Sequence, residues 1–198
     1  MATIHHRYII FFKPYNVLSQ FTDTDGRATI SQFGPFPKDV YPVGRLDYDS
    51  EGLLLLTDDA ELIHRLLEPR FGHPRTYWVQ VEGELSEADL QQLRSGIVFQ
   101  NQKTLPAEAR LLESDPDFGI RSEPIHPRRG KPTRWIELVL REGRNRQVRK
   151  MTAVVGYPTL RLVRVKIGTI DIGSLKPGES RGLTQEEIYS LRSLVQLS

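Results

Sequence analysis

The stretch that decides the fold runs Gly44-Arg45-Leu46-Asp47-Tyr48-Asp49-Ser50-Glu51-Gly52-Leu53-Leu54-Leu55-Leu56-Thr57. Residues 40–45 and 52–57 have the apolar composition of short strands, and the polar residues 46–51 form a predicted turn between them. Asp47 therefore lies in a loop that buried strands hold at both ends. A carboxylate in that position is placed rigidly, as catalysis demands. The alternative is that Asp47, Asp49 and Ser50 only close the turn, because Asp and Ser are common turn residues.

Outward from this stretch, strands and helices interleave without a regular βαβ repeat. Hydrophobic periodicity predicts strands at residues 8–12, 76–82, 105–112, 135–140 and 159–170. Capping signals and helical spacing predict helices at residues 59–68, 86–96, 145–155 and 184–197. Residues 114–134 are rich in proline, glycine and arginine, which predicts a long surface loop able to contact a partner. This order favours an α+β fold with a mixed sheet.

Composition excludes several classes of protein. The 198 residues are 38% hydrophobic and 26% charged, as is ordinary for a globular chain. The lack of cysteine excludes disulfides and thiolate chemistry, and the five histidines show no ligand spacing, so no metal site is expected. The apolar runs are far shorter than the roughly 20 residues of a membrane span, and residues 1–7 lack the features of a secretory signal. A cytoplasmic protein without membrane contact is expected.

The net charge of +2 hides a segregation of charge along the chain. Residues 121–166 carry 13 Lys and Arg against 3 acids, a local net charge of +10, whereas the preceding 120 residues carry a net charge of −7. A basic block this dense is what binding to a phosphate backbone requires. The alternative is a solvated charged face.

Residues 141–151, Arg-Glu-Gly-Arg-Asn-Arg-Gln-Val-Arg-Lys-Met, place five basic side chains around the start of a predicted helix. Cations at a helix N-terminus oppose the macrodipole, so another interaction must favour them there. Arg146 and Lys150 lie one turn apart, as do Asn145 and Arg149, so one basic face can meet phosphates while another points inward. A helix with solvated charges is the alternative.

Four motifs, in order along nearly the whole chain, resemble those of the RsuA-like pseudouridine synthases. They are Lys13-Pro14 after the first strand, residues 44–57, Tyr77 within residues 76–83, and residues 142–151 followed by residues 155–158 and 160–162. Four motifs in the correct order and spacing rarely arise by chance. Three further segments, residues 13–18, 20–23 and 105–107, are similar to the branch of the family that acts on the large ribosomal subunit.

The resemblance implies a fold, an activity and a substrate. The fold would be a pseudouridine synthase catalytic domain, which is a mixed, largely antiparallel central sheet with flanking helices, made of two ferredoxin-like halves. It would span residues 1–198 as one domain, without the small RNA-binding S4 domain that many relatives carry. The activity would be the isomerisation of a specific uridine in ribosomal RNA, that of the large subunit (23S rRNA), by a monomer that needs no cofactor.

The resemblance also implies catalytic roles for three residues. Asp47 matches the catalytic aspartate, and Arg149 matches a basic residue placed against it, where a cation favours the ionised carboxylate. Tyr77 matches an active-site tyrosine that stacks on the target base, although a tyrosine in a strand can also be a plain core aromatic.

Arg45 matches an arginine that contacts phosphate or helps to extrude the target nucleotide, which cannot react while it is stacked. The other RNA contacts are expected from the basic block. The full set of side chains expected to bind RNA is Arg45, Arg128, Arg129, Lys131, Arg144, Arg146 and Lys150.

The implied reaction leaves the first step open between attack of Asp47 on the sugar, attack on the base, and proton abstraction from the ribose. Two other functions compete with it. An RNA-binding module without activity would need the basic block but not Asp47. A hydrolase of nucleosides or glycans would need a second acid at a set separation, for which Asp49 is the near candidate.

Overall fold

The computed structural model describes residues 6–128 and 130–197. Its strands are β1 (Tyr8–Lys13), β2 (Tyr41–Pro42), β3 (Glu51–Thr57), β4 (Arg75–Glu82), β5 (Val98–Phe99), β6 (Gln102–Lys103), β7 (Glu108–Leu111), β8 (Thr133–Leu140), β9 (Thr159–Ile167), β10 (Ile170–Asp171) and β11 (Ser180–Gly182). Its α-helices are α1 (Ala60–Leu67), α2 (Glu87–Ser95), α3 (Gln147–Val154) and α4 (Gln185–Leu194), and two short 3-10 helices are η1 (Ile30–Phe33) and η2 (Pro69–Phe71).

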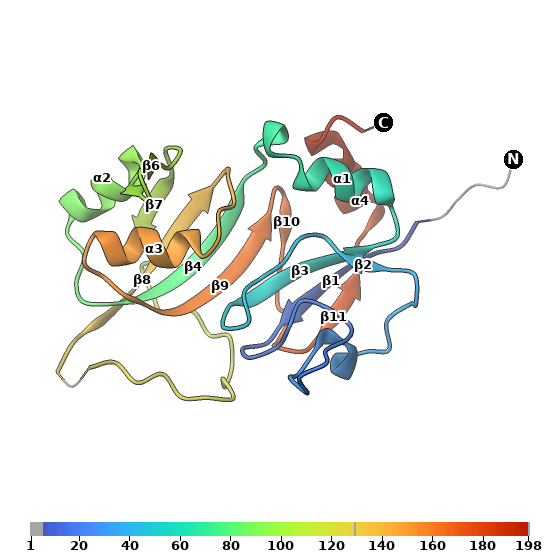
Figure 1. Ribbon diagram of the computed structural model, residues 1–198, viewed down its shortest axis with the longest axis horizontal. Helices are drawn as coiled ribbons and strands as arrows, with labels where there is room; N and C mark the ends of the chain where they lie inside the picture. The colour runs from blue at the N-terminus through green and yellow to red at the C-terminus, as the bar shows by residue number, and fades with distance from the viewer. Residues whose placement is uncertain (1–5, 129, 198) are drawn as a thin grey trace, which may run out of the picture.

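A single long sheet of nine strands runs through the part of the chain that the structure describes (Figure 1). Its order is β11-β1-β3-β9-β4-β8-β7, with β2 beside β3 and β10 beside β9. β3 and β9 pair in parallel, and the other neighbours in this order are antiparallel. The mixed, largely antiparallel sheet with flanking helices is therefore confirmed.

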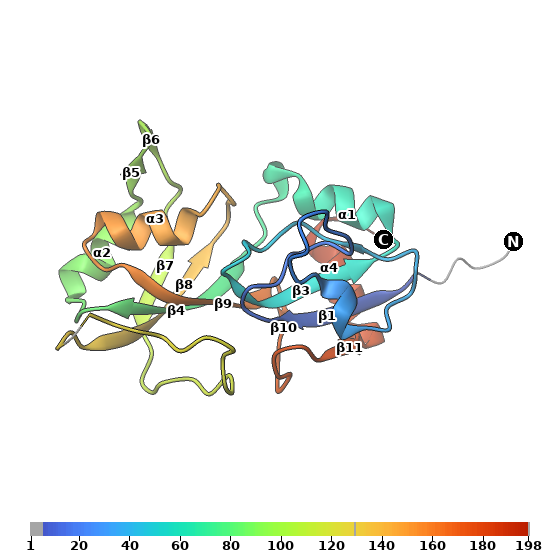
Figure 2. The ribbon, with the colours of Figure 1, turned by 60° about the horizontal axis from the view of Figure 1, so that its bottom comes forward.

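The helices cover the sheet at its two ends (Figure 2). At one end, α1 and α4 pack through Leu62 and Leu191 onto a core that includes Ile10 and Phe12 of β1. At the other end, α2 and α3 pack onto β4 and β8 in a second core. Residues 44–57, which include Asp47, lie in the first half, and the basic helix α3 lies in the second. The middle of the sheet brings them together.

The four-leucine run of β3 is buried on both faces of the sheet. Leu53 and Leu55 join the core beneath α1 and α4, whereas Leu54 and Leu56 face a third cluster with Phe11 and residues of the loop before β2. A strand buried on both sides needs a continuous apolar run instead of an alternating one. This burial fixes the position of the residues that precede Leu53.

Most predicted elements are confirmed, and the shortest ones were missed. The strand predicted at residues 40–45 is the two-residue β2, and the one predicted at 105–112 is β7. The strand predicted at 159–170 is divided into β9 and β10 by a turn at Gly168, whose φ is 56°. The β5–β6 hairpin and β11 were not predicted, because strands of two or three residues carry no periodicity.

The loop predicted at residues 114–134 is present between β7 and β8, but its first half is anchored. The Phe118 ring packs against Phe12, Trp78 and Trp135, with ring centroids 5.9, 5.7 and 5.9 Å away. Arg121 then stacks over the Tyr15 ring, 3.4 Å from its centroid. These contacts attach the loop to the core, which its composition did not indicate.

Candidate active site

The turn that carries Asp47 is fixed through its backbone. The Ser19 hydroxyl donates to the carbonyl of Leu46 and accepts from the N–H of Leu46, both at 3.0 Å. The Ser50 N–H donates to the carbonyl of Asp47 at 3.0 Å and closes the turn. The backbone on both sides of Asp47 is thus held by hydrogen bonds, which places its carboxylate rigidly.

Two buried cations hold the turn from beneath. The Lys13 ammonium donates to the carbonyls of Val17 at 2.7 Å and Tyr48 at 3.3 Å, and burial lowers its pKa to about 7 although nearby carboxylates raise it. Arg161 forms a buried two-bonded ion pair with Glu51, at 3.0 and 2.7 Å. Since Glu51 begins β3, this pair fixes the point where the turn enters the sheet.

Asp47 faces an arginine of the basic segment, but not the predicted one. Arg146 Nη1 lies 3.7 Å from Asp47 Oδ2, and the same guanidinium binds both oxygens of Asp49 at 2.8 Å. Arg149 instead donates to the carbonyl of Asp49 at 2.7 Å, with its Nε 3.4 Å from Asp49 Oδ2. The direct ion pair with Asp47 is thus made by Arg146, and the catalytic role expected of Arg149 stays a prediction.

Asp49 is the electrostatic centre of this cluster. Burial raises its pKa, but the hydrogen bond from Arg146 and the charges of Arg149 and Arg146 outweigh burial, so its pKa lies below the ordinary value. Asp49 is therefore a bound carboxylate at neutral pH. Its part is to hold the two arginines beside Asp47.

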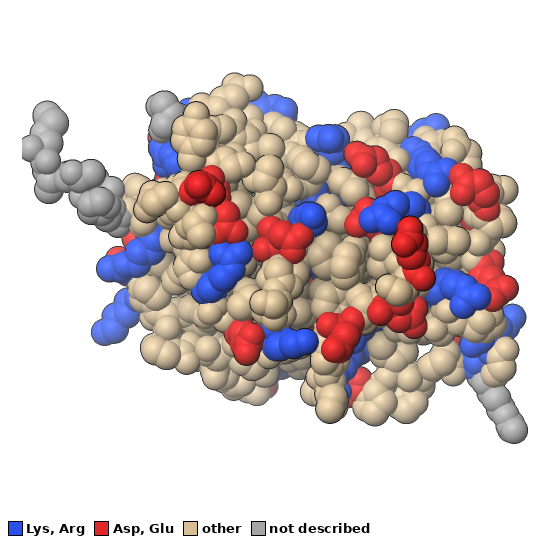
Figure 3. Space-filling model, turned by 180° about the vertical axis from the view of Figure 1, so that it is seen from behind, with Lys and Arg blue, Asp and Glu red and all other residues tan. Residues whose placement is uncertain are grey.

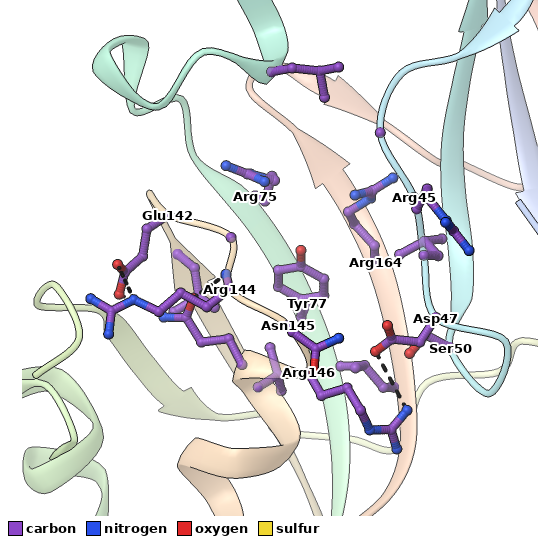
Figure 4. Close-up of a pocket in the computed structure, with 18 of the residues that line it drawn as sticks. Arg45, Asp47, Ser50, Arg75, Tyr77, Glu142, Arg144, Asn145, Arg146 and Arg164 are labelled. Atoms are coloured by element: carbon purple, nitrogen blue, oxygen red, sulfur yellow. Dashed lines mark hydrogen bonds and ion pairs between the residues drawn. The ribbon is translucent and has the colours of Figure 1, made fainter. Parts of the chain in front are cut away.

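A pocket of about 510 Å³ opens next to this cluster (Figure 4). Tyr77 of β4 lies on its floor, Asp47 lies at one side, and Val148 and Leu162 contribute apolar surface. The flat, half-buried ring of Tyr77 beside a carboxylate offers a stacking surface for a planar base. The predicted pair of Asp47 and Tyr77 is brought together.

Cations outnumber acids among the charged residues that line the pocket. Its acidic members are Asp47 and Glu142, and its basic members are Arg45, Arg75, Arg144, Arg146 and Arg164. By contrast, the far face of the molecule carries Lys, Arg, Asp and Glu side by side without a large area of one sign (Figure 3). An excess of fixed guanidinium groups in a concave site favours a ligand with negative charge.

Four of the predicted RNA-binding residues lie at or beside this pocket. Arg45, Arg144 and Arg146 line it, and the Lys150 ammonium lies 5.4 Å from the centre of the Phe99 ring, next to Arg144 at 5.8 Å from the same ring. Arg144 is also fixed by Glu142 at 3.1 Å. The basic segment therefore forms one rim of the pocket.

The predicted residues of the long loop are placed differently. The Arg128 N–H donates to Glu82 at 2.7 Å and its guanidinium forms an ion pair with the same buried carboxylate, so Arg128 anchors the loop to β4. Lys131 is exposed. Arg129 lies outside the described residues.

Sequence reasoning missed two arginines of the pocket floor, Arg75 and Arg164. A signal was present, because side chains two apart on a strand share a face, and Arg75 precedes Tyr77 by two. Arg164 could not be found in this way, since its position opposite Tyr77 depends on the pairing of β4 with β9.

No group of three His, Cys, Asp or Glu side chains that could hold a metal ion occurs among the described residues. In the same part of the chain, no helix has the length and apolarity that a membrane crossing needs.

Comparison with known proteins gives consistent results. The family model described as RNA pseudouridylate synthase matches residues 7–154. Ribosomal large subunit pseudouridine synthase E of Xanthomonas campestris pv. campestris is 52% identical over 175 residues, which cover 87% of this chain and 93% of that protein. The enzyme of the same name from Vibrio parahaemolyticus is 49% identical, over 88% of this chain and 73% of that protein.

A solved structure supports the same relationship. The crystal structure of a pseudouridylate synthase superposes with a TM-score of 0.78 at 30% identity, covering 96% of this chain and 75% of that one. The archaeal box H/ACA Nop10-Cbf5 complex shares the fold alone, with a TM-score of 0.53 at 14% identity.

Proposed function

The chain belongs to the RNA pseudouridylate synthase family, and we propose that it converts a uridine of large-subunit ribosomal RNA to pseudouridine. The choice of RNA rests on the names of the relatives, which are ribosomal large subunit pseudouridine synthases. The observation that carries the activity is Asp47, held on a fixed turn at the side of an arginine-lined pocket whose floor is Tyr77.

The reaction exchanges one bond for another. The bond between N1 of the base and C1′ of the ribose breaks, the base turns and C5 bonds to C1′. The proton on C5 is lost and N1 gains a proton, so the product is an isomer of uridine. Asp47 supplies a nucleophile or base next to a sugar carbon that becomes electron-poor, as carboxylates do in glycoside cleavage. The exchange has no net redox change, and we propose that it needs no cofactor.

The neighbours of Asp47 take supporting roles. Arg146 orients the carboxylate, and Arg149 fixes the turn through the backbone of Asp49. Tyr77 stacks on the extruded uracil and is placed to assist loss of the C5 proton. Both roles follow from position beside the pocket and from the match to the family motifs.

RNA reaches the pocket along its basic rim. We assign phosphate contacts to Arg45, Arg144, Arg146 and Lys150, with Arg45 helping to hold the flipped nucleotide at a cost of a few kcal/mol in lost stacking. We further propose that the enzyme acts as a monomer with a single catalytic domain, in the cytoplasm where ribosomal RNA is made.

Hydrolysis is the competing activity, and the state of Asp49 disfavours it. A hydrolase needs a second carboxyl group free to act as acid or base. Both carboxylate oxygens of Asp49 are bound by Arg146. Isomerisation needs one free carboxylate only, which is Asp47.

The test is the product. Purified protein is incubated with ribosomal RNA from cells that lack it, and the RNA is mapped for pseudouridine while the supernatant is assayed for uracil. We expect one new pseudouridine and no free uracil. Free uracil in proportion to enzyme, without pseudouridine, would show a hydrolase instead.

A further inference from the structure

Two arginines on the pocket floor have no part in the reaction as described above. Arg75 of β4 and Arg164 of β9 both line the pocket, and their side chains flank the space next to Tyr77 (Figure 4). Tyr77 and Arg164 are paired across the two neighbouring strands. A base stacked on Tyr77 would therefore lie within reach of both guanidinium groups.

These two cations are not neutralised by the fold. Arg164 is 4% exposed, its Nε donates to the carbonyl of Leu53 at 2.8 Å, and its buried Nη2 has no hydrogen-bond partner. The Nε of Arg75 is also buried without a partner. Within residues 6–128 and 130–197, no carboxylate forms an ion pair with either residue. Since a guanidinium stays charged, burial without a counter-charge destabilises the fold.

The surroundings of His73, just before β4, also reflect the positive charge of the two pocket-floor arginines. Its ring is 5% exposed, and burial is the main cause that lowers its pKa to about 4. The charges of Arg75 and Arg164 lower this pKa further, because they disfavour another cation nearby. The pocket floor is thus a region of positive potential with unused hydrogen-bond donors.

The reaction produces a negative charge at this place. Whichever group Asp47 attacks first, the electron pair of the N1–C1′ bond leaves with the base. Uracil is then an anion, with the charge shared among N1, O2 and O4, until C5 bonds to C1′ and the C5 proton departs. Donors that are fixed beside such a charge before it forms lower the barrier most.

We propose that Arg164, together with Arg75, forms an anion site for the detached uracil and stabilises the negative charge that cleavage of the glycosidic bond places on the ring. The inference rests on the proposed function and makes both arginines catalytic residues. It also explains why an arginine without a carboxylate partner is kept inside the fold.

Removal of the charge tests this site. Arg164→Gln should lower kcat about 100-fold, the effect of losing one fixed donor to a developing anion, with KM changed less than about threefold. Its Tm should stay the same or rise, because a buried cation without a counter-charge is removed. Arg164→Lys should recover part of kcat.

Arg161→Gln is the matched control, since Arg161 is also a buried arginine of β9 but is paired with Glu51. It should lower Tm clearly, because it leaves a buried carboxylate without its partner. If Arg164→Gln keeps kcat within about threefold of wild type, or loses Tm as Arg161→Gln does, the anion site is wrong.

A binding measurement without turnover gives a second test. Barbiturate is a planar pyrimidine that is an anion at neutral pH, and uracil is its neutral counterpart. Wild-type protein should bind barbiturate at least about tenfold more tightly than uracil, and Arg164→Gln should remove the difference. Barbiturate should also raise the pKa of His73 in an NMR titration, since it offsets the arginine charges.

Equal binding of barbiturate and uracil by wild-type protein would overturn the inference even if an arginine variant failed to fold. Wild-type protein that prefers barbiturate but forms no pseudouridine in ribosomal RNA would leave the anion site standing and refute the proposed function.

Discussion

Arg146 joins two carboxylates that have different tasks. It binds Asp49 through two hydrogen bonds of 2.8 Å and lies 3.7 Å from Asp47. The bonds to Asp49 fix the guanidinium, and the longer contact places it beside Asp47. Arg146 thus lies beside Asp47 without a short hydrogen bond to its oxygens.

This arrangement predicts different outcomes for the two arginines. Arg146→Ala should reduce kcat about 100-fold with little change in Tm, because its contacts lie at the partly exposed pocket. Arg149→Ala should reduce both kcat and Tm, because Arg149 is largely buried and holds the backbone of the turn. Arg141→Ala, an exposed arginine outside the pocket, is the control and should change neither. Equal behaviour of the Arg146 and Arg149 variants would contradict the assignment.

The sequence predicts which residues meet at the site better than it predicts their contacts. Motif order placed Asp47, Tyr77 and the basic segment together. It could not show that Arg146 precedes α3 with a φ of 53°, in the left-handed region, because residue type does not signal that conformation in an arginine. That backbone lets Arg146 reach the turn, while Arg149 lies one helical turn further on.

At the scale of elements, Asp59 connects three segments. It caps α1 by accepting the Leu62 N–H at 3.0 Å, and it also accepts from the Tyr8 hydroxyl of β1 at 2.7 Å and from Arg192 of α4 at 2.6 Å. Burial raises the pKa of Tyr8 to about 12, with a further contribution from Asp59. The cap thus ties both helices of this half to the sheet.

Asp59→Ala should lower the free energy of unfolding by about 2–4 kcal/mol, because it removes a helix cap and one member of a mostly buried ion pair. Glu61→Ala, in the first turn of the same helix, removes an exposed ion pair with Arg65 and should cost less than about 1 kcal/mol. Urea denaturation measures both. A cost for Asp59→Ala no larger than that for Glu61→Ala would mean that the cap does not hold the half together.

The segment before β4 makes stability depend on pH through His73. Its folded pKa of about 4 lies below the ordinary 6.5, so the unfolded chain binds the proton more tightly. The full stability is present above pH 6.5 and falls as the pH drops toward 4, by up to about 3 kcal/mol. Urea denaturation between pH 4.5 and 7 should show a clearly smaller slope for His73→Gln than for wild type. The same slope in both proteins would exclude His73 as the cause.

Hydrophobic periodicity and capping signals predicted the long helices and strands, but they did not predict the short strands. The capping boxes at Ser86 and Thr184 were readable and both form. The two-residue strands β5 and β6 form a hairpin whose turn residues Gln100 and Asn101 have φ of 53° and 59°, which their types do not require. Phe118 anchors the long loop through tertiary contacts, which no local sequence pattern can predict.

At the scale of the whole molecule, much of the basic block is paired with carboxylates of the same chain. Arg128, Arg134, Arg161 and Lys166 form ion pairs with Glu82, Glu84, Glu51 and Asp171. Charge counted along the sequence therefore overstates the charge offered to RNA. Arg144 and Arg146 at the pocket rim are paired as well, with Glu142 and Asp49, but both line the pocket together with Arg45. These pocket cations are the candidates for phosphate contacts.

RNA binding should reflect this difference between paired and available arginines. No hydrogen bond or ion pair of the Arg45 guanidinium is found with the described residues, whereas Arg128 is paired with Glu82. Arg45→Ala should weaken binding and flatten the logarithmic salt slope by roughly 0.7–0.9. Arg128→Ala should leave the salt slope unchanged. Filter binding over a series of salt concentrations measures both slopes. A flatter slope for Arg128→Ala would show that the loop between β7 and β8 contacts phosphates after all.

We propose above all that Asp47 is the carboxylate that promotes cleavage of the N1–C1′ bond and formation of the C5–C1′ bond. Asp47→Asn keeps the shape of the side chain and removes its charge, so the variant should fold and bind RNA as wild type does. The most direct measurement is tritium release from ribosomal RNA labelled at C5 of uridine, with the RNA taken from cells that lack the protein. We predict no release above background for Asp47→Asn against complete release by wild type. Release by the variant within about tenfold of the wild-type rate would contradict the account.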